Sequence, residues 1–234
     1  MAGSAMIEIV PAILVKDKED FARKVASVSA HVERVQIDIM DGKFVPNTTL
    51  SPEEFPPIPK KLLVEYHLMV ENPLDYVRRI GKKGAIYELH VESLKEIGVE
   101  KAIASVKKMG GRVALAISPD TPVSAVAPYL AHVEHVLVMT VYPGFSGQKY
   151  LPAMEKKMRE LAGMGAVVEV DGGVGLGSAR SAAAAGATLL GVASAIFSVE
   201  PSSTSDAFSK RKMHIAQPDV ASAIKKIKKD AECK

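Results

Sequence analysis

Four polar side chains stand at or near the ends of apolar runs. If these runs are the parallel strands of an α/β protein, ligands usually bind just beyond their carboxyl ends. Gln36 and Asp38 are two residues apart in one predicted strand, so both point to the same side of it. His67 and Asp171 end two other predicted strands. If these ends converge, two carboxylates and an imidazole could bind a divalent cation or exchange protons with a substrate.

A structural explanation stays open for each of these residues taken singly. Asp38 and Asp171 would then cap loops, and His67 would be a hydrogen-bonded core histidine. His90 and Glu92 form a further pair at a strand end, and this pair could support the site from behind. Three methionines near the same strand ends could simply fill gaps in the core: Met40, Met69 and Met139. The remaining histidines are interpreted as structural: His31, His132, His135 and His214.

Small residues follow the last two predicted strands. Gly172 and Gly173 have no Cβ, so backbone N–H groups can approach a ligand there. Ala193 and Ser194 begin a helix, whose free N–H groups favour an anion. The loops after the seventh and eighth strands are the usual phosphate site of a β/α barrel, which makes a phosphate site our hypothesis. A glycine pair alone fits an ordinary tight turn equally well.

Composition limits the class of protein. The chain has 234 residues, of which 47% are hydrophobic, and this is enough for one barrel-sized core. A net charge of +3 and only 5% aromatic residues argue against a nucleic-acid partner, and no apolar run is long enough to predict a membrane span. The basic run at 225–229 should be a solvated helix face. The single cysteine, Cys233, fits a cytoplasmic location.

Apolar runs alternate with amphipathic helical stretches along the chain. We expect strands at 7–14, 32–39, 62–69, 85–90, 112–117, 135–141, 167–170 and 189–192. We expect helices at 18–29, 73–82, 99–109, 121–129, 151–164 and 178–185, with another from Ala193 and a last one through 220–229. This order predicts a (β/α)8 TIM barrel as a single domain over 7–234. An open doubly wound sheet is the alternative, but its glycine-rich first turn is missing.

Three segments depart from this rhythm. Residues 1–6 look like a cloning scar and are set aside. Residues 41–59 are rich in proline and should form an ordered loop over the barrel mouth. Residues 200–217 are polar and should form a surface excursion before the last helix.

Four segments of the chain resemble the signature segments of the ribulose-phosphate 3-epimerase family. They are VQIDIMDGKFVPN at 35–47, EYHLMVENP at 65–73, HVLVMTVYPGFSGQKY at 135–150 and VEVDGGV at 168–174. They occur in the family's order and extend over most of residues 7–197. The resemblance implies a homo-oligomeric (β/α)8 enzyme that interconverts D-ribulose 5-phosphate and D-xylulose 5-phosphate, with a phosphosugar as its only expected small-molecule partner.

The resemblance also implies roles for individual residues. In that family two aspartates act on opposite faces of C3, and a divalent metal (Zn, Mn, Mg or Fe) holds the enediolate oxygens. Asp38 and Asp171 match these aspartates, and Asp38, His67 and Asp171 match metal ligands. Met40, Met69 and Met139 match the methionines packed over the metal. The phosphate-binding turns match Gly144, Ser146, Gly147, Gly172, Gly173, Ala193 and Ser194.

The sequence departs from the family pattern at the metal site. Gln36 stands where the family has its first metal histidine, and a neutral amide is a poor substitute for imidazole. We therefore expect a weakened metal site, one that holds Mg²⁺ or Mn²⁺ through oxygen, or one that holds no metal. In the last case the Gln36 amide would donate to the enediolate oxygen.

Other departures affect contacts with the sugar phosphate. The first strand lacks the family's serine at Ala12, and Tyr142 replaces an asparagine. Ser146 and Ala193 each replace a glycine of the phosphate turns.

Two other functions remain beside a ketose-phosphate 3-epimerase. A phosphosugar lyase or isomerase on a related barrel would commonly place a lysine near the carboxylates of the second strand, where this chain has Met40 between Asp38 and Asp41. A non-catalytic phosphosugar-binding protein would fit the losses at Gln36 and Ala12. The retention of both aspartates favours the epimerase.

Overall fold

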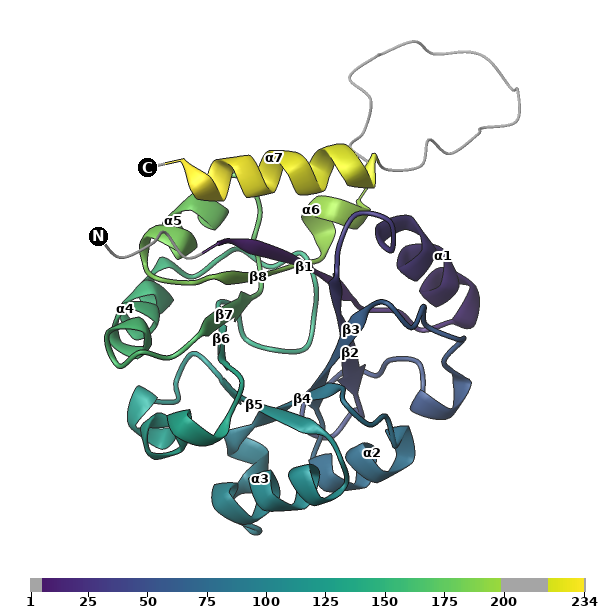
Figure 1. Ribbon diagram of the computed structural model, residues 1–234, viewed down its shortest axis with the longest axis vertical. Coiled ribbons are helices and arrows are strands. Elements are labelled where there is room, and N and C mark those ends of the chain that lie inside the picture. The colour runs from purple at the N-terminus through teal and green to yellow at the C-terminus, as the bar shows by residue number, and fades with distance from the viewer. Residues whose placement is uncertain (1–5, 199–218, 234) are drawn as a thin grey trace.

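Eight parallel strands pair in chain order and close into a barrel, as the computed structural model describes for residues 6–198 and 219–233 (Figure 1). The strands are β1 Glu8–Ile13, β2 Arg34–Met40, β3 Leu63–Met69, β4 Ile86–His90, β5 Arg112–Ile117, β6 Val136–Met139, β7 Val168–Asp171 and β8 Leu189–Val192. β8 pairs with β1 and closes the sheet. The predicted (β/α)8 barrel is confirmed, and the open doubly wound alternative is wrong.

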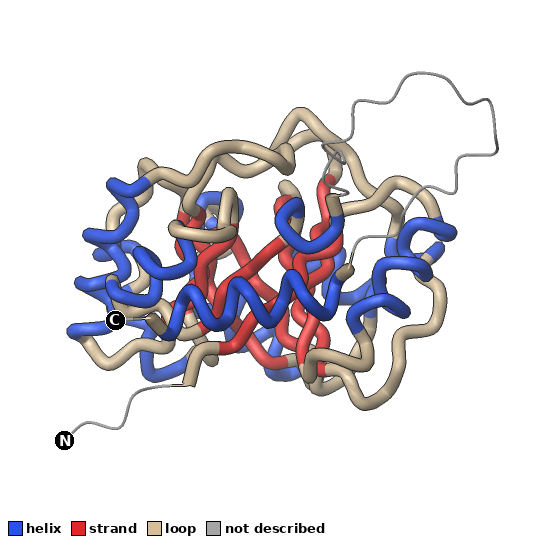
Figure 2. The backbone as a smooth tube through the Cα atoms, turned by 90° about the horizontal axis from the view of Figure 1, so that it is seen from above, coloured by secondary structure: helices blue, strands red, loops and turns tan. Residues whose placement is uncertain are grey.

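The helices surround the barrel, as Figure 2 shows from a second direction. They are α1 Lys18–Val28, α2 Pro73–Ile80, α3 Val99–Lys108, α4 Glu155–Gly163, α5 Ser178–Ala184, α6 Ser194–Phe197 and α7 Val220–Glu232. The helix predicted at 121–129 is wrong, because two short 3-10 helices, Val123–Ala125 and Ala127–His132, replace it. Pro128 explains the break, since it lacks an N–H and its ring clashes with a preceding carbonyl of an α-helix.

Two predictions concern the ends of the domain. The surface excursion predicted at 200–217 lies outside the described residues, so the span 7–234 for one domain stays a prediction. On α7, Lys225 and Lys226 are exposed while Ile224 and Ile227 are buried, which confirms a solvated basic face. None of the helices in the described part of the chain combines the length and the apolar character that crossing a membrane requires.

The two faces of the barrel strands differ in chemistry. Outward residues such as Ile37, Leu68 and Leu115 are fully buried in the apolar layer between strands and helices. The interior of a TIM barrel is usually filled by bulky apolar side chains. Here the buried polar residues of the strands include Gln36, Asp38, Glu65, His67, Glu88, His90, Glu169 and Asp171. The interior of this barrel is therefore its polar compartment, whereas its outer layer is the conventional core.

Strand register stacks these polar side chains. Between β2 and β3, Asp38 lies beside His67 and Gln36 lies beside Glu65. Because side chains alternate along a strand, the residue two positions before an inward residue also points inward, one layer closer to the amino ends of the strands. Glu65 and Glu169 therefore occupy a layer below His67 and Asp171.

The segment at 41–59 is ordered, as predicted. The Asp41 carboxylate accepts hydrogen bonds from the backbone N–H groups of Lys43, Phe44 and Glu71, at 2.8–3.0 Å. Asn47 Nδ2 donates to the carbonyl of Gly144, 2.8 Å away, and so ties this loop to the loop after β6. These contacts hold the segment at the barrel mouth.

Farther along the same segment, Phe55 anchors the loop on the outside of the barrel. Its ring stacks on Phe21 at a centroid distance of 4.9 Å and on Tyr66 at 6.4 Å. Phe21 is fully buried. We predict that Phe21→Ala lowers the free energy of unfolding by about 3–5 kcal/mol, because it leaves a cavity beneath Phe55. Urea unfolding followed by circular dichroism measures the change. Met164→Ala, at a half-exposed position, is the control and should stay within about 0.5 kcal/mol of the parent; an equal loss in both variants would contradict this account.

Candidate active site

One pocket opens at the carboxyl ends of the strands and collects nearly all of the predicted site residues. Its lining includes Asp38, Met40, Met69, Met139, Gly144, Ser146, Gly147, Asp171, Gly172, Gly173, Ala193 and Ser194. His67 and Gln36 lie just beneath, fully buried. The fold therefore brings together the carboxylates, the methionines and the three small-residue turns singled out from the sequence.

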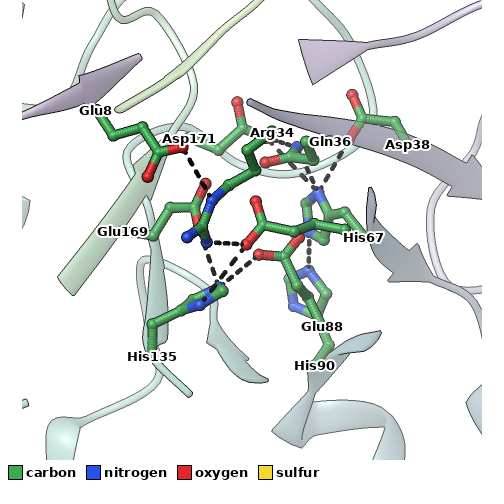
Figure 3. Close-up of polar contacts among 11 residues, drawn as sticks. Glu8, Arg34, Gln36, Asp38, His67, Glu88, His90, His135, Glu169 and Asp171 are labelled. Atoms are coloured by element: carbon green, nitrogen blue, oxygen red, sulfur yellow. Dashed lines mark hydrogen bonds and ion pairs between the residues drawn. The ribbon is translucent and has the colours of Figure 1, made fainter. Parts of the chain in front are cut away.

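Gln36 stands at the centre of the polar cluster (Figure 3). Its Nε2 donates to Asp38 Oδ1 at 2.7 Å and to Asp171 Oδ2 at 3.0 Å, and it lies 3.3 Å from His67 Nδ1. A side-chain amide has two N–H donors, and each is used by one carboxylate. The amide thus bridges two aspartates that come from β2 and β7. The expectation that Gln36 donates to a substrate oxygen is wrong for this arrangement, because both N–H groups are engaged below the pocket.

His67 is held by partners on both ring nitrogens. Its Nδ1 lies 3.1 Å from Asp38 Oδ1, and its Nε2 lies 2.9 Å from His90 Nε2. His90 Nδ1 in turn lies 3.2 Å from Glu92 Oε2. The pair His90–Glu92 therefore supports His67 from behind, as its position at a strand end suggested.

The charges of the cluster follow from burial and from these contacts. Burial lowers the pKa of His67, but the hydrogen bond and the charge of Asp38 outweigh it and raise the pKa to about 9. Burial and the nearby charge of Asp38 raise the pKa of Asp171 to about 7, although His67 and Gln36 oppose this shift. At neutral pH the cluster thus contains an imidazolium and a carboxyl group that is close to half-protonated.

The pKa shifts of His67 and His90 give the hydrogen bonds of these two rings one direction. Burial lowers the pKa of His90, so this ring is neutral. A protonated His67 donates from Nδ1 to Asp38 and from Nε2 to His90, whose Nδ1–H is left to donate to Glu92. All four groups have complementary donors and acceptors in this state.

The turns beside the pocket depend on glycine. Gly172 and Gly173 have φ values of 113° and 67°, in the region that other residues rarely adopt. A Cβ on Gly173 would lie 2.4 Å from the backbone nitrogen of Tyr150. Any larger residue would push the loops after β6 and β7 apart, so the turn is built for close backbone approach. α6, by contrast, has only four residues and adds little helix dipole.

Several residues of the pocket and its surroundings were not identified from the sequence. The lining also includes Leu14, Phe145, Gln148 and Gly191. Gly191 could have been found, because an isolated glycine in a strand signals a close approach, here of the Gln36 amide oxygen. The other omission is His135, interpreted as structural, which lies within 2.9 Å of two glutamates inside the barrel.

The free energy of unfolding should depend on pH through Glu92. Burial alone would raise the pKa of Glu92, but hydrogen bonds from His90, Thr121 and the Ser118 N–H lower it to about 2. A lowered carboxyl pKa stabilises the fold above the unfolded-state pKa, and this contribution is lost as pH falls toward the folded pKa. The loss should therefore begin near 4.5, the ordinary pKa of a glutamate, and continue as pH falls toward about 2.

We predict that Glu92→Gln destabilises the protein at about pH 6, and that the deficit is about 1 kcal/mol smaller at about pH 3.5. Urea unfolding at the two pH values measures the difference. Glu96→Gln, at an exposed position on the same segment, is the matched control. A deficit that is the same at both pH values would contradict the assigned charge of Glu92.

Comparison with known proteins gives sequence relatives along nearly the whole chain. A ribulose-phosphate 3-epimerase, cytoplasmic isoform, from Oryza sativa subsp. japonica is 38% identical and covers 90% of this chain and 96% of its own. A ribulose-phosphate 3-epimerase from Rhodobacter capsulatus is 35% identical and covers 90% of this chain and 94% of its own.

Solved structures agree in fold at much lower identity. KGPDC from Streptococcus mutans has a TM-score of 0.62 at 11% identity, with 97% of each chain covered. A 3-hexulose-6-phosphate synthase from Salmonella typhimurium has a TM-score of 0.60 at 15% identity, covering 96% of this chain and 98% of its own. These likenesses concern the barrel alone. The sequence profile of the ribulose-phosphate 3-epimerase family, however, matches residues 8–197, and together with the relatives above it shows that this chain belongs to that family.

Proposed function

We propose that this protein is a ketose-phosphate 3-epimerase, with D-ribulose 5-phosphate and D-xylulose 5-phosphate as its substrate pair. The observation that carries the proposal is a pair of carboxylates, Asp38 and Asp171, which reach one pocket from β2 and β7 and share the amide of Gln36. Inversion at a carbon requires one group to remove a proton and another to return it to the opposite face. Two carboxylates on separate strands satisfy this requirement.

The protonation of the pair suits the reaction. The C2 carbonyl acidifies the proton at C3, so a carboxylate can remove it. Asp171, with its pKa raised to about 7, can hold a proton at neutral pH while Asp38 acts as the base. After proton removal, Asp171 donates its proton from the other side, and the two residues exchange roles in the reverse direction.

The buried groups beneath the pair supply positive charge. The imidazolium of His67 lies 3.1 Å from Asp38 and 3.6 Å from Asp171. When Asp38 takes the C3 proton, the substrate becomes an anion, and the positive charge of His67 attracts this anion. The Gln36 amide holds both carboxylates in place and so limits their movement between the two proton transfers.

A divalent metal fits this arrangement poorly. One ligand atom each from Asp38, His67 and Asp171 can be chosen so that all lie within 4.8 Å of one another, as metal ligands do. The Nε2 group of Gln36 nevertheless lies within 3.3 Å of all three side chains and occupies their common centre. A protonated His67 also has no lone pair to offer a metal. We therefore infer that Gln36 weakens or excludes the metal, and we assign no step to one.

The phosphate of the substrate is proposed to bind at the turns around Ser146–Gly147, Gly172–Gly173 and Ala193–Ser194. All six residues line the same pocket as the aspartates. Backbone N–H groups at such turns bind anions without a charged side chain, and only the N–H of Ala193 would be needed. The homo-oligomeric state and the cytoplasmic location remain predictions.

The pocket lining favours the epimerase over the two alternatives. No lysine is among the described residues that line it, although a lysine near the carboxylates would be expected of the related lyases. A protein that only bound phosphosugars would have no use for two buried carboxylates with one of them raised to a pKa of about 7.

We predict that Asp38→Asn or Asp171→Asn lowers kcat by about 10²–10⁴-fold, because each variant removes one acid/base group. The assay incubates the protein with D-ribulose 5-phosphate in deuterated water and follows deuterium at C3 by NMR. Binding of the phosphosugar, measured by calorimetry, should persist in both variants. Near-normal activity in either variant would remove that aspartate from the mechanism, and absence of exchange in the parent would refute the epimerase.

We also predict that Gln36→His creates a zinc site, because it replaces an amide donor with a fourth strong ligand. After dialysis against a chelator, elemental analysis should find one additional zinc per chain relative to the parent. Gln36→Leu, which removes the amide without adding a ligand, is the control. If the parent already retains a zinc bound by Asp38, His67 and Asp171, the inferred effect of Gln36 is wrong.

A further inference from the structure

A second polar cluster fills the barrel one layer below the candidate active site. It consists of Glu65 on β3, Glu88 on β4, Glu169 on β7 and His135, which directly precedes β6. Each of the glutamates is fully buried, and His135 is 2% exposed. None of these four side chains lines the pocket, and the proposed reaction uses none of them.

Carboxylate oxygens in this layer lack partners. Glu169 Oε1, Glu65 Oε2 and Glu88 Oε2 accept no hydrogen bond from any described residue, and the contact of Glu169 Oε2 is with His135 Nε2, which Glu88 also approaches. A buried carboxylate without partners is strongly unfavourable. His135 Nε2 lies 2.8 Å from Glu88 Oε1 and 2.9 Å from Glu169 Oε2, so two carboxylates share one ring nitrogen, and Nδ1 is 3.8 Å from Glu65 Oε1. The centre of the layer therefore has more acceptor oxygens than donors.

The spacing of the atoms is that of metal ligands. One ligand atom from each of the four side chains can be chosen so that all lie within 4.8 Å of one another. His135 Nε2 lies 2.8 Å from Glu88 Oε1 and 2.9 Å from Glu169 Oε2. Adjacent ligands at about 2.1 Å from a metal are separated by about 3 Å, so the distances from His135 Nε2 to these two carboxylate oxygens are those of neighbouring ligands. The side chains converge in Figure 3, where His135, Glu88 and Glu169 point toward one another.

The charges of the layer select a dication. Arg34 Nη1 is 2.5 Å from Glu65 Oε1 and supplies one positive charge at the amino end of the barrel. A divalent ion bound among the three carboxylates would displace any proton that they hold, and it would bind His135 as a neutral imidazole. Three carboxylates and one imidazole suit first-row ions that accept both oxygen and nitrogen, such as Mn²⁺ or Zn²⁺.

Access is available from the amino end of the barrel. Arg34 has a side chain 17% exposed and lines a surface hollow with Glu8 and Leu63. Movement of this one side chain would open a path from the hollow to Glu65. We propose that Glu65, Glu88, His135 and Glu169 form a binding site for a divalent transition-metal ion inside the barrel, separate from the catalytic pocket.

The test uses the full chain, stripped with a chelator, and Mn²⁺ alone as the probe. Asp171→Asn serves as the background, because it removes a carboxylate from the upper cluster and leaves all four proposed ligands in place. Electron paramagnetic resonance titration should find one Mn²⁺ bound per chain. In the same background, Glu169→Gln or Glu88→Gln should weaken binding by more than about 100-fold, since each removes a direct ligand. Glu8→Gln, which changes a partner of Arg34 that is not a ligand, should leave the affinity unchanged.

Thermal unfolding gives an independent measurement. Mn²⁺ should raise the Tm of the Asp171→Asn protein, and it should not raise that of Asp171→Asn/Glu88→Gln. Circular dichroism establishes that each variant is folded, and the two glutamine variants serve as substitutes for one another if either fails to fold. Absence of Mn²⁺ binding in the Asp171→Asn protein would overturn the proposal, as would binding that is equally strong in both glutamine variants. In either case the layer would be a network of carboxylates and protons only.

Discussion

Carboxylates that point into the barrel have little water around them, so other groups inside the barrel have to offset their negative charge. The arrangement of the interior depends on this constraint. The closed sheet turns every second strand residue inward, and five carboxylates from four strands are placed there: Asp38, Glu65, Glu88, Glu169 and Asp171. All five are buried, and the three glutamates are fully so, which makes their charge depend on a neighbouring cation, an amide donor or a bound proton. The outer apolar layer holds these strands together and keeps the polar interior in register.

In the layer of Asp38 and Asp171, other groups of the protein offset the two carboxylates. An amide bridges the two aspartates, the pKa of the His67 imidazole beside them is raised to about 9, and burial with the charge of Asp38 raises the pKa of Asp171 to about 7. Behind them, Glu92 orients His90 and His90 orients His67, so each ring has one stable arrangement of its hydrogen atoms. The catalytic proposal and the departure at Gln36 are therefore two aspects of the same charge balance.

The sequence predicts the fold and the residues that line the pocket. It does not predict the contacts of Gln36 and His135, because their partners are distant in the chain. The alternation of apolar runs and helical stretches gives the barrel, and strand-end positions give Asp38, His67 and Asp171. The hydrogen bonds of Gln36 depend on how β2 faces β7 across the barrel, which a linear pattern does not contain. His135 looked structural because its three glutamates come from β3, β4 and β7, and each appears as a single polar residue in an apolar strand. Pro128 offered a local signal against the predicted helix at 121–129, and its effect was underestimated.

The hydrogen bond between Asn47 and Gly144 couples the movements of two loops beside the pocket. It joins the loop after β2 to the loop after β6, and Gly144 also packs against Val45. Asn47 and Gly144 are 97 positions apart in the chain, and Gly144 lines the pocket that contains both aspartates. A movement that separates the two loops therefore has to break this hydrogen bond, and otherwise they move together. Asn47 does not line the pocket, yet its hydrogen bond couples the positions of two loops beside it.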